Sequence, residues 1–284
     1  MKPAEFQYLA DLLKRNSGIV IGQDKMYLVE SRLGPLAIEN GCRDLDDLVG
    51  RLRLQPKGPI ADRVIEAMTT NETFFFRDKT PFTEFESHVL PELIKARADT
   101  KRLRIWCAAA SSGQEPYSLA MILKENAAKL PGWRIEIVGT DLSKEILEKA
   151  KAGIYSQFEV QRGLPVNLLV KYFRQQGELW HIDPAIKSMV RLQPYNLLEP
   201  YTGLGQFDVV FCRNVLIYFD RPTKKSILER MAHLMPSDGR LFLGAAETVV
   251  GLTPVFQAVT GKRGLYEVSA GGDATLKRTG TFGT

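Results

Sequence analysis

The stretch Leu103-Arg104-Ile105-Trp106-Cys107-Ala108-Ala109-Ala110-Ser111-Ser112-Gly113-Gln114-Glu115-Pro116-Tyr117-Ser118 decides the fold class of this 284-residue chain. It begins with a mostly apolar run typical of a strand, continues through small residues, and enters a helical pattern near Glu115. Small side chains let the backbone approach a ligand closely, and the helix start presents unpaired N–H groups. A tight turn that merely needs small residues is the alternative interpretation.

The same alternation of short apolar runs and amphipathic helices continues along the rest of the chain. Further runs are Ile135 to Gly139, Val209 to Cys212 and Leu241 to Gly244, and helices are expected near Glu115 to Lys129, Lys144 to Ala152 and Thr223 to Leu234. This order predicts an α/β fold with a doubly wound, mostly parallel sheet whose ligands bind at the carboxyl ends of the strands.

The alternation of strand-like runs and amphipathic helices is interrupted at about residues 172–195. Two short strands, Glu178 to Ile182 and Lys187 to Gln193, are expected there around Asp183-Pro184. They predict a small antiparallel β-subdomain inserted into the α/β domain.

The N-terminal part has helical periodicity throughout. A first helix carries an apolar stripe that Gly18 closes as C-cap, and a second is expected to begin at Asp24 and to bend or end at Pro35. The predicted division is an all-helical domain (1–75), a connecting helix (76–98), the α/β domain (99–269) and a disordered tail (270–284).

Composition excludes several classes of protein. No apolar run approaches the roughly 20 residues of a membrane span, and no signal-peptide block opens the chain, so a cytoplasmic protein without membrane insertion is expected. Three cysteines and three histidines are scattered, which argues against a disulfide framework and a metal site. The net charge of +5 is spread thinly, with ten basic and ten acidic residues in 1–70, so no nucleic-acid partner is expected.

Two acidic residues follow successive predicted strands and indicate the ligand. Glu115 at a helix start suits a cationic ammonium group, and no phosphate-binding G-x-x-x-x-G-K-[ST] loop is present. Asp141 stands where an acidic residue accepts hydrogen bonds from ribose hydroxyls, although it could equally cap the helix near Ser143. An adenosine with an amino-acid tail satisfies both residues, which describes S-adenosylmethionine.

Two aromatic segments add polar candidates to this site. In Phe211 to Phe219 an Arg-Asn pair interrupts an apolar run, so Asn214 can face the pocket, and Tyr218 either packs in the core or offers its hydroxyl there. In Asn71 to Asp78 three phenylalanines are expected in the core while the flanking polar residues stay free to bind.

Together these motifs resemble the chemotaxis receptor glutamate methyltransferase family, CheR, over about residues 5 to 268. The motifs are Asn71-x-Thr73-x-x-x-Arg77, Ala108 to Ser118, Thr140-Asp141-Leu142 and Cys212 to Phe219. The resemblance implies a class I S-adenosylmethionine-dependent methyltransferase domain behind a helical N-terminal domain. By motif match it places cofactor contacts at Asn71, Thr73, Arg77, Glu115, Asp141, Asn196, Leu197, Asn214 and Val215, and the active-site pair at Arg77 and Tyr218.

The resemblance also implies the reaction and the partner. A methyl group passes to glutamate carboxylates on the cytoplasmic helical bundle of chemoreceptors, leaving methyl esters and S-adenosylhomocysteine, and the enzyme acts as a monomer in sensory adaptation. A carboxylate is already ionised near pH 7, so no general base is required. Arg77 is expected to orient the acceptor carboxylate or to bind the carboxylate of the cofactor.

Two segments depart from the best-known members of the family, and both concern receptor binding. The region Asp24 to Asn40 offers only Lys25 and Arg32 as basic residues, so a weaker electrostatic docking face is expected. The segment Gln175 to Glu178 looks short, which predicts pentapeptide-independent receptor binding.

Two other functions compete with this interpretation. A nucleic-acid methyltransferase would usually place prolines after the Asn at the strand end, whereas Val215-Leu216-Ile217 follows here. A non-catalytic S-adenosylmethionine-binding signalling module is disfavoured because both Arg77 and Tyr218 are present.

Overall fold

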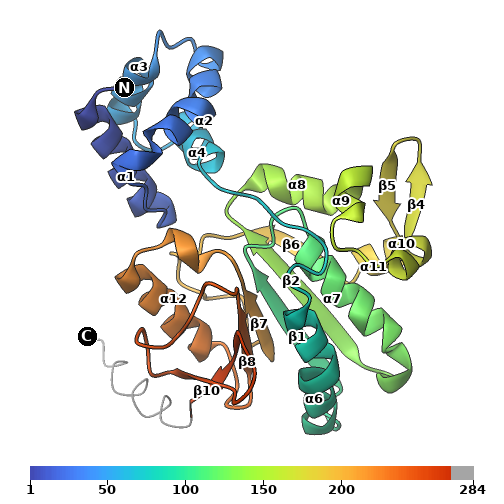
Figure 1. Cartoon of the computed structure of the whole chain (residues 1–284). Coiled ribbons are helices and arrows are strands. Elements are labelled where there is room, and N and C mark those ends of the chain that lie inside the picture. The colour runs from blue at the N-terminus through green and yellow to red at the C-terminus, as the bar shows by residue number, and fades with distance from the viewer. Residues whose placement is uncertain (270–284) are drawn as a thin grey trace.

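The computed structural model describes residues 1–269, so the predicted tail (270–284) lies outside the described residues. The N-terminal part is all-helical, as predicted, with α1 (Pro3–Ser17), the short 3-10 turn η1 (Gln23–Lys25), α2 (Met26–Glu39), α3 (Leu45–Leu54) and α4 (Pro59–Ala67) (Figure 1). The stripe of α1 packs into one core with α2, α3 and α4, formed by Phe6, Leu9, Leu12, Leu13, Val29, Leu33, Leu48, Leu52 and Val64. Burial of these side chains holds the four helices together.

The ends of these helices match the sequence expectation in part. Gly18 is the C-cap of α1, as predicted, with a φ of 77° that glycine adopts readily. Asp24 does not begin the second helix, because it lies in η1 and α2 begins at Met26. Pro35 does not end α2, since it lies on the exposed face of the helix, where water can solvate the carbonyl group that proline leaves without a partner.

A seven-stranded sheet forms the second part, in the order β6-β2-β1-β7-β8-β10-β9. Its strands are β1 (Arg102–Ala108), β2 (Arg134–Asp141), β6 (Val190–Pro194), β7 (Val209–Cys212), β8 (Arg240–Leu243), β9 (Phe256–Ala258) and β10 (Leu265–Val268). The five strands from β6 to β8 are parallel, and β10 and β9 are antiparallel. The predicted mostly parallel sheet is confirmed.

Helices cover both faces of this sheet. On one face Ile105 and Cys107 of β1 share a core with α5 (Thr80–Glu84), the π-helical turn η2 (Phe85–Val89), α6 (Leu90–Ala96) and α7 (Gln114–Glu125). On the other face Trp106 shares a core with α12 (Arg221–His233), and Figure 1 shows α12 on the opposite side from α6 and α7. The side chains of β1 alternate between the two cores because successive residues of a strand point to opposite faces.

The small antiparallel sheet differs from the expected one. It has the order β3-β5-β4, with β3 (Ile154–Ser156), β4 (Phe173–Gln176) and β5 (Leu179–Ile182), and α9 (Gln157–Gln161) and α10 (Val166–Tyr172) join β3 to β4. The expected strand Lys187 to Gln193 instead becomes β6, which pairs in parallel with β2. The short helix α11 (Pro184–Lys187) turns the chain toward the main sheet, and no local pattern shows which sheet a short apolar run will join.

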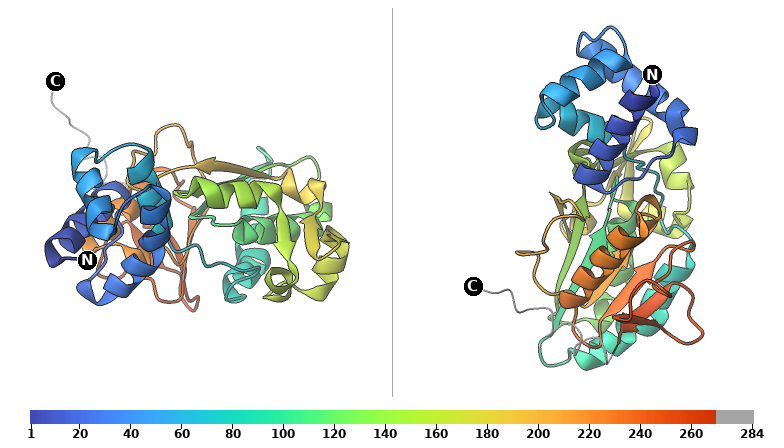
Figure 2. Two further views of the ribbon diagram at one scale, coloured as in Figure 1. Left: turned by 90° about the horizontal axis from the view of Figure 1, so that it is seen from above. Right: turned by 90° about the vertical axis from the view of Figure 1, so that its left-hand side faces the viewer.

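The helical part lies above the α/β part, as the right view of Figure 2 shows, and contacts the loops that follow β2, β6 and β7. Hydrogen bonds between the two parts fix it there. Among them, Glu66 Oε1 accepts from Ser143 Oγ at 2.7 Å, Asn196 Nδ2 donates to the Asn16 carbonyl at 2.6 Å, and Val20 N donates to the Tyr218 carbonyl at 2.9 Å. Of the helices within residues 1–269, none has both the length and the apolar character that a membrane crossing requires.

Candidate functional site

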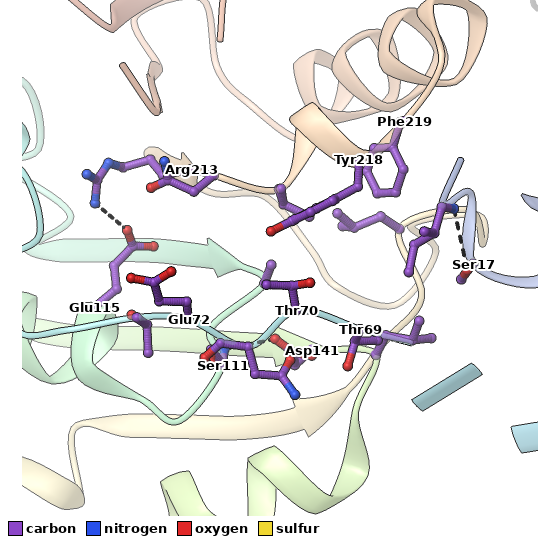
Figure 3. A pocket seen from close by; sticks show the side chains of 18 of the residues that line it. Ser17, Thr69, Thr70, Glu72, Ser111, Glu115, Asp141, Arg213, Tyr218 and Phe219 are labelled. Atoms are coloured by element: carbon purple, nitrogen blue, oxygen red, sulfur yellow. Dashed lines mark hydrogen bonds and ion pairs between the residues drawn. The ribbon is translucent and has the colours of Figure 1, made fainter. Parts of the chain in front are cut away.

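A pocket with an empty volume of about 880 Å³ lies where the helical part meets the ends of the strands (Figure 3). Every site residue expected from the sequence lines it: Asn71, Thr73, Arg77, Glu115, Asp141, Asn196, Leu197, Asn214, Val215 and Tyr218. The fold therefore brings together motifs that lie far apart in the chain.

The loop after β1 bends through an unusual backbone. Ala109 (φ 70°) and Ser111 (φ 49°) are both left-handed although neither is glycine, and Gly113 (φ 92°) precedes α7. Ser111 Oγ donates to the Asn71 carbonyl at 2.8 Å, so this loop also holds the segment from the helical part. Left-handed non-glycine residues gather at functional sites, which favours the ligand-binding interpretation of this loop over a mere tight turn.

Asp141, the last residue of β2, joins two loops of the pocket. Its Oδ2 accepts from Ser111 N at 2.8 Å and its Oδ1 from Ser143 N at 3.0 Å. Burial raises the pKa of the Asp141 carboxyl, and these backbone hydrogen bonds oppose the rise. Asp141 is not the N-cap of α8 (Lys144–Ala152), because Ser143 occupies that position.

Glu115 lies in the first turn of α7 and is paired with Arg213. Its Oε2 accepts from Arg213 Nη1 at 2.7 Å, and within the described residues no hydrogen bond goes to its Oε1. Burial raises the pKa of Glu115, whereas the Arg213 guanidinium opposes that rise. One carboxylate oxygen is thus left to face the pocket.

Arg77 is held at its position by the segment that precedes it. Its Nη1 donates to the Glu72 carbonyl at 2.7 Å, and its guanidinium carbon lies 5.6 Å from the centre of the Phe74 ring. Phe74 is only half-buried, so the expectation of three core phenylalanines is wrong for this residue, and only Phe75 is fully buried. Phe74 therefore supports Arg77 instead of filling the core.

The loop after β7 is held by Glu247, which sequence reasoning missed. Its two carboxylate oxygens accept from the backbone N–H groups of Asn214 (2.8 Å), Val215 (3.0 Å), Leu216 (2.7 Å) and Gly244 (2.7 Å). The only signal in the sequence is that Glu247, like Asp141, follows the end of an apolar run closely. Three of these four donors lie in the loop after β7, so the carboxylate fixes the course of this loop and connects it to Gly244 after β8.

Asn196 and Tyr218 connect the pocket to the helical part. The Asn196 amide is already engaged, since its Nδ2 donates to the Asn16 carbonyl and its Oδ1 accepts from Leu198 N at 3.0 Å. The Tyr218 hydroxyl points into the pocket, on the side of Arg213, with Asp141 and Ser111 on the opposite side (Figure 3).

The helical part itself contributes lining residues that the sequence did not indicate. They lie at the end of α1 and after α4, and they are Ser17, Ile19, Thr69 and Thr70. Nothing in their local pattern marks them, because only docking of the helical part places them at the pocket.

Known proteins match the chain over nearly its whole length. Residues 4–69 match the CheR methyltransferase all-alpha domain and residues 71–265 the CheR methyltransferase SAM binding domain. Chemotaxis protein methyltransferase 1 of Pseudomonas aeruginosa is 46% identical over 90% of this chain and 94% of its own length. Chemotaxis protein methyltransferase Cher2 of Pseudomonas putida is 44% identical over the same shares, 90% and 94%. Among solved structures, a complex of DhpI with S-adenosylhomocysteine aligns at 15% identity and a TM-score of 0.32, covering 68% of this chain and 72% of that one.

Proposed function

The chain belongs to the CheR methyltransferase family and is an S-adenosylmethionine-dependent methyltransferase that modifies chemoreceptors, and we propose that its acceptors are glutamate side-chain carboxylates. The family match confirms the resemblance found in the sequence. Convergence of Glu115, Asp141, Arg77 and Tyr218 on one pocket is the observation that supports this proposal most directly. The relatives reported above are all named chemotaxis methyltransferases, so the two alternative functions are not favoured.

The donor set of the pocket fits S-adenosylmethionine. Asp141 offers carboxylate oxygens to ribose hydroxyls at the end of β2, and Glu115 offers its Oε1 to an ammonium group. Leu197 and Val215 give an apolar flank for the adenine, and Glu247 fixes the loop that carries Val215. Asn71 and Thr73 lie on the side that the helical part closes. In this assignment the Asn196 side chain ties the two parts together, so its contact with the cofactor would be made by its backbone.

S-adenosylmethionine, when bound, would supply a methyl group on a sulfonium sulfur: transfer to a glutamate oxygen would form the O–C bond, break the C–S bond and leave its electron pair on sulfur. No proton is transferred, so the protein must orient the acceptor and exclude water. Arg77 carries a planar guanidinium that can hold the acceptor carboxylate or that of the cofactor, and Tyr218 lines the same pocket. The helical part closes the pocket above them.

The proposed partner is the cytoplasmic helical bundle of a chemoreceptor, approached by a monomeric cytoplasmic enzyme. Helix α2 and the turn η1 before it offer this bundle little positive charge, since Arg32 donates to the Met68 and Thr69 carbonyls at 2.9 and 2.8 Å and Lys25 pairs with Asp24. Receptor docking in this protein therefore depends less on the basic residues of α2 than in the best-known members of the family.

Incubation of the protein with methyl-labelled S-adenosylmethionine and receptor-bearing membranes tests the function. Base-labile label in the receptor is expected, because methyl esters hydrolyse in base. Label in DNA or RNA would support the nucleic-acid alternative, and binding without transfer would support the signalling module.

A further inference from the structure

Arg213 contacts both halves of the proposed site through one guanidinium. Its Nη1 donates to Glu115 Oε2 at 2.7 Å, and its Nη2 donates to the Arg77 carbonyl and to Asp78 Oδ2, each at 2.8 Å. The side chain is only 1% exposed. Resting on the proposed function, we infer that Arg213 is a positioning residue that fixes the Glu115 carboxylate and the Arg77 loop to each other.

The Arg77 loop needs such an anchor because its backbone is strained. Phe76 (φ 52°), Asp78 (φ 68°) and Lys79 (φ 48°) all have a positive φ without being glycine. A run of such residues persists only when surrounding contacts hold it. The two bonds from Arg213 Nη2 reach this loop at the Arg77 carbonyl and at the side chain of the next residue, Asp78, so they hold the backbone that carries the Arg77 side chain.

The ion pair with Arg213 also keeps the Glu115 carboxylate in the pocket negatively charged. Burial and the nearby Glu247 raise the pKa of Glu115, whereas Arg213 and Arg77 lower it. Without Arg213 the buried carboxyl would take up a proton at a higher pH, and a neutral acid attracts an ammonium group far less strongly. Arg213 occupies only Oε2, so it maintains the negative charge without covering the oxygen that faces the ligand.

A lysine could not perform both tasks. Its ammonium keeps the positive charge in the buried site, but a single nitrogen cannot reach Glu115 and the Arg77 loop as the two ends of a guanidinium do. Arg213→Lys and Arg213→Gln therefore separate the two effects, since the first keeps the charge and the second removes it. Asp78→Asn weakens only the loop side and tolerates the left-handed backbone.

The test measures the binding of two ligands and the rate of receptor methylation. Binding of S-adenosylhomocysteine and of 5′-methylthioadenosine, which lacks the amino-acid portion, is measured from pH 5.5 to 8.5 together with kcat for receptor methylation. Arg213→Lys should keep S-adenosylhomocysteine affinity within about threefold and lose at least roughly tenfold in kcat. Arg213→Gln should in addition lose S-adenosylhomocysteine affinity by roughly tenfold or more, with methylthioadenosine affinity unchanged.

The pH dependence of S-adenosylhomocysteine affinity distinguishes this role from a merely structural one, which would not shift it. Ammonium binding requires ionised Glu115, so affinity is present above its pKa and is lost as the pH falls through it. Because Arg213→Gln raises this pKa, the loss should occur at higher pH than in the wild type. Methylthioadenosine binding should show no such shift.

Arg104→Lys is the matched control. Arg104 is another buried arginine with forked bonds, to Glu136 Oε2 and to the Leu204 and Gln206 carbonyls, and it does not line the pocket. If the Arg213 variants behave like this control, with both ligands affected equally, the inference is wrong. If neither Arg213 variant folds, Asp78→Asn decides, and a wild-type kcat in that variant would overturn the inference. Failure of the wild type itself to bind or transfer would instead refute the proposed function.

Discussion

Glu66, near the end of the last N-terminal helix, caps a helix of the α/β part through Ser143. Its Oε1 accepts both from Ser143 Oγ and from the backbone N–H of Glu145, each at 2.7 Å. Ser143 N in turn donates to Asp141 Oδ1 at 3.0 Å. One carboxylate thus connects the helical part to the residue proposed to bind the ribose.

Replacing Glu66 by alanine should weaken cofactor binding, although Glu66 would not itself contact the cofactor. Loss of a capping carboxylate costs about 1 kcal/mol, which corresponds to roughly fivefold in affinity if the Asp141 loop loosens accordingly. Titration with S-adenosylhomocysteine measures this effect. Asp62→Ala, an exposed acidic residue one turn earlier on α4, is the control and should leave the affinity unchanged.

Glu247→Gln should damage the adenosine side of the pocket. The amide nitrogen of glutamine would face N–H donors where an oxygen now accepts, leaving buried donors without partners at a cost of about 1–3 kcal/mol. A lower Tm and at least roughly tenfold weaker binding of both S-adenosylhomocysteine and methylthioadenosine are expected. Glu267→Gln on β10 is the control. Unchanged binding in Glu247→Gln would show that the loop after β7 holds its course without this carboxylate.

Arg77→Ala should lose most receptor methylation. The guanidinium is held by the Glu72 carbonyl and the Phe74 ring at the pocket, and its removal leaves the acceptor without an orienting cation, at a cost of roughly a hundredfold in kcat. Single-turnover methylation with saturating cofactor measures the loss. An unchanged rate together with unchanged cofactor affinity would refute the role assigned to Arg77.

The contact between Lys14 and Asp220 should make the docking of the helical part sensitive to acid. Hydrogen bonds from Lys14 and Thr223 lower the pKa of Asp220 from 3.8 to about 2. A carboxyl whose folded-state pKa is lowered stabilises the fold above its ordinary pKa and loses this effect as the pH falls toward 2. Urea unfolding of the wild type and of Lys14→Met should therefore differ slightly at pH 6 and converge as the pH falls through the range from about 4 to about 2. A difference that persists at the lowest pH would mean that Lys14 acts through packing instead of charge.

Receptor binding should not involve a C-terminal pentapeptide tether. Strands β4 and β5 are joined by a tight turn at Gly177-Glu178, since Gln176 pairs directly with Leu179, and so the hairpin carries no extended loop to grip a peptide. Fluorescence titration with such a peptide should show no tight binding. Saturable binding at low micromolar concentration would overturn this prediction.

The order of strands and helices could be read from the sequence because it depends on local periodicity. The runs that became β1, β2, β7 and β8 are each recognisable within a few residues. The boundaries of the small sheet could not be read in this way. The run that became β6 pairs with β2, about fifty residues earlier in the chain, and that choice depends on which edge the folded sheet leaves open.

The sequence by itself determined the two-part organisation, the family and ten of the residues that line the pocket, because motifs preserve residue type and spacing along the chain. Only the tertiary structure decided which groups the side chains in and around the pocket contact. It placed Arg213 between Glu115 and the Arg77 loop, gave Glu247 its four backbone donors, and used the Asn196 side chain as a tether. These roles arise from hydrogen-bond geometry between distant segments, which the spacing of residues along the chain does not encode.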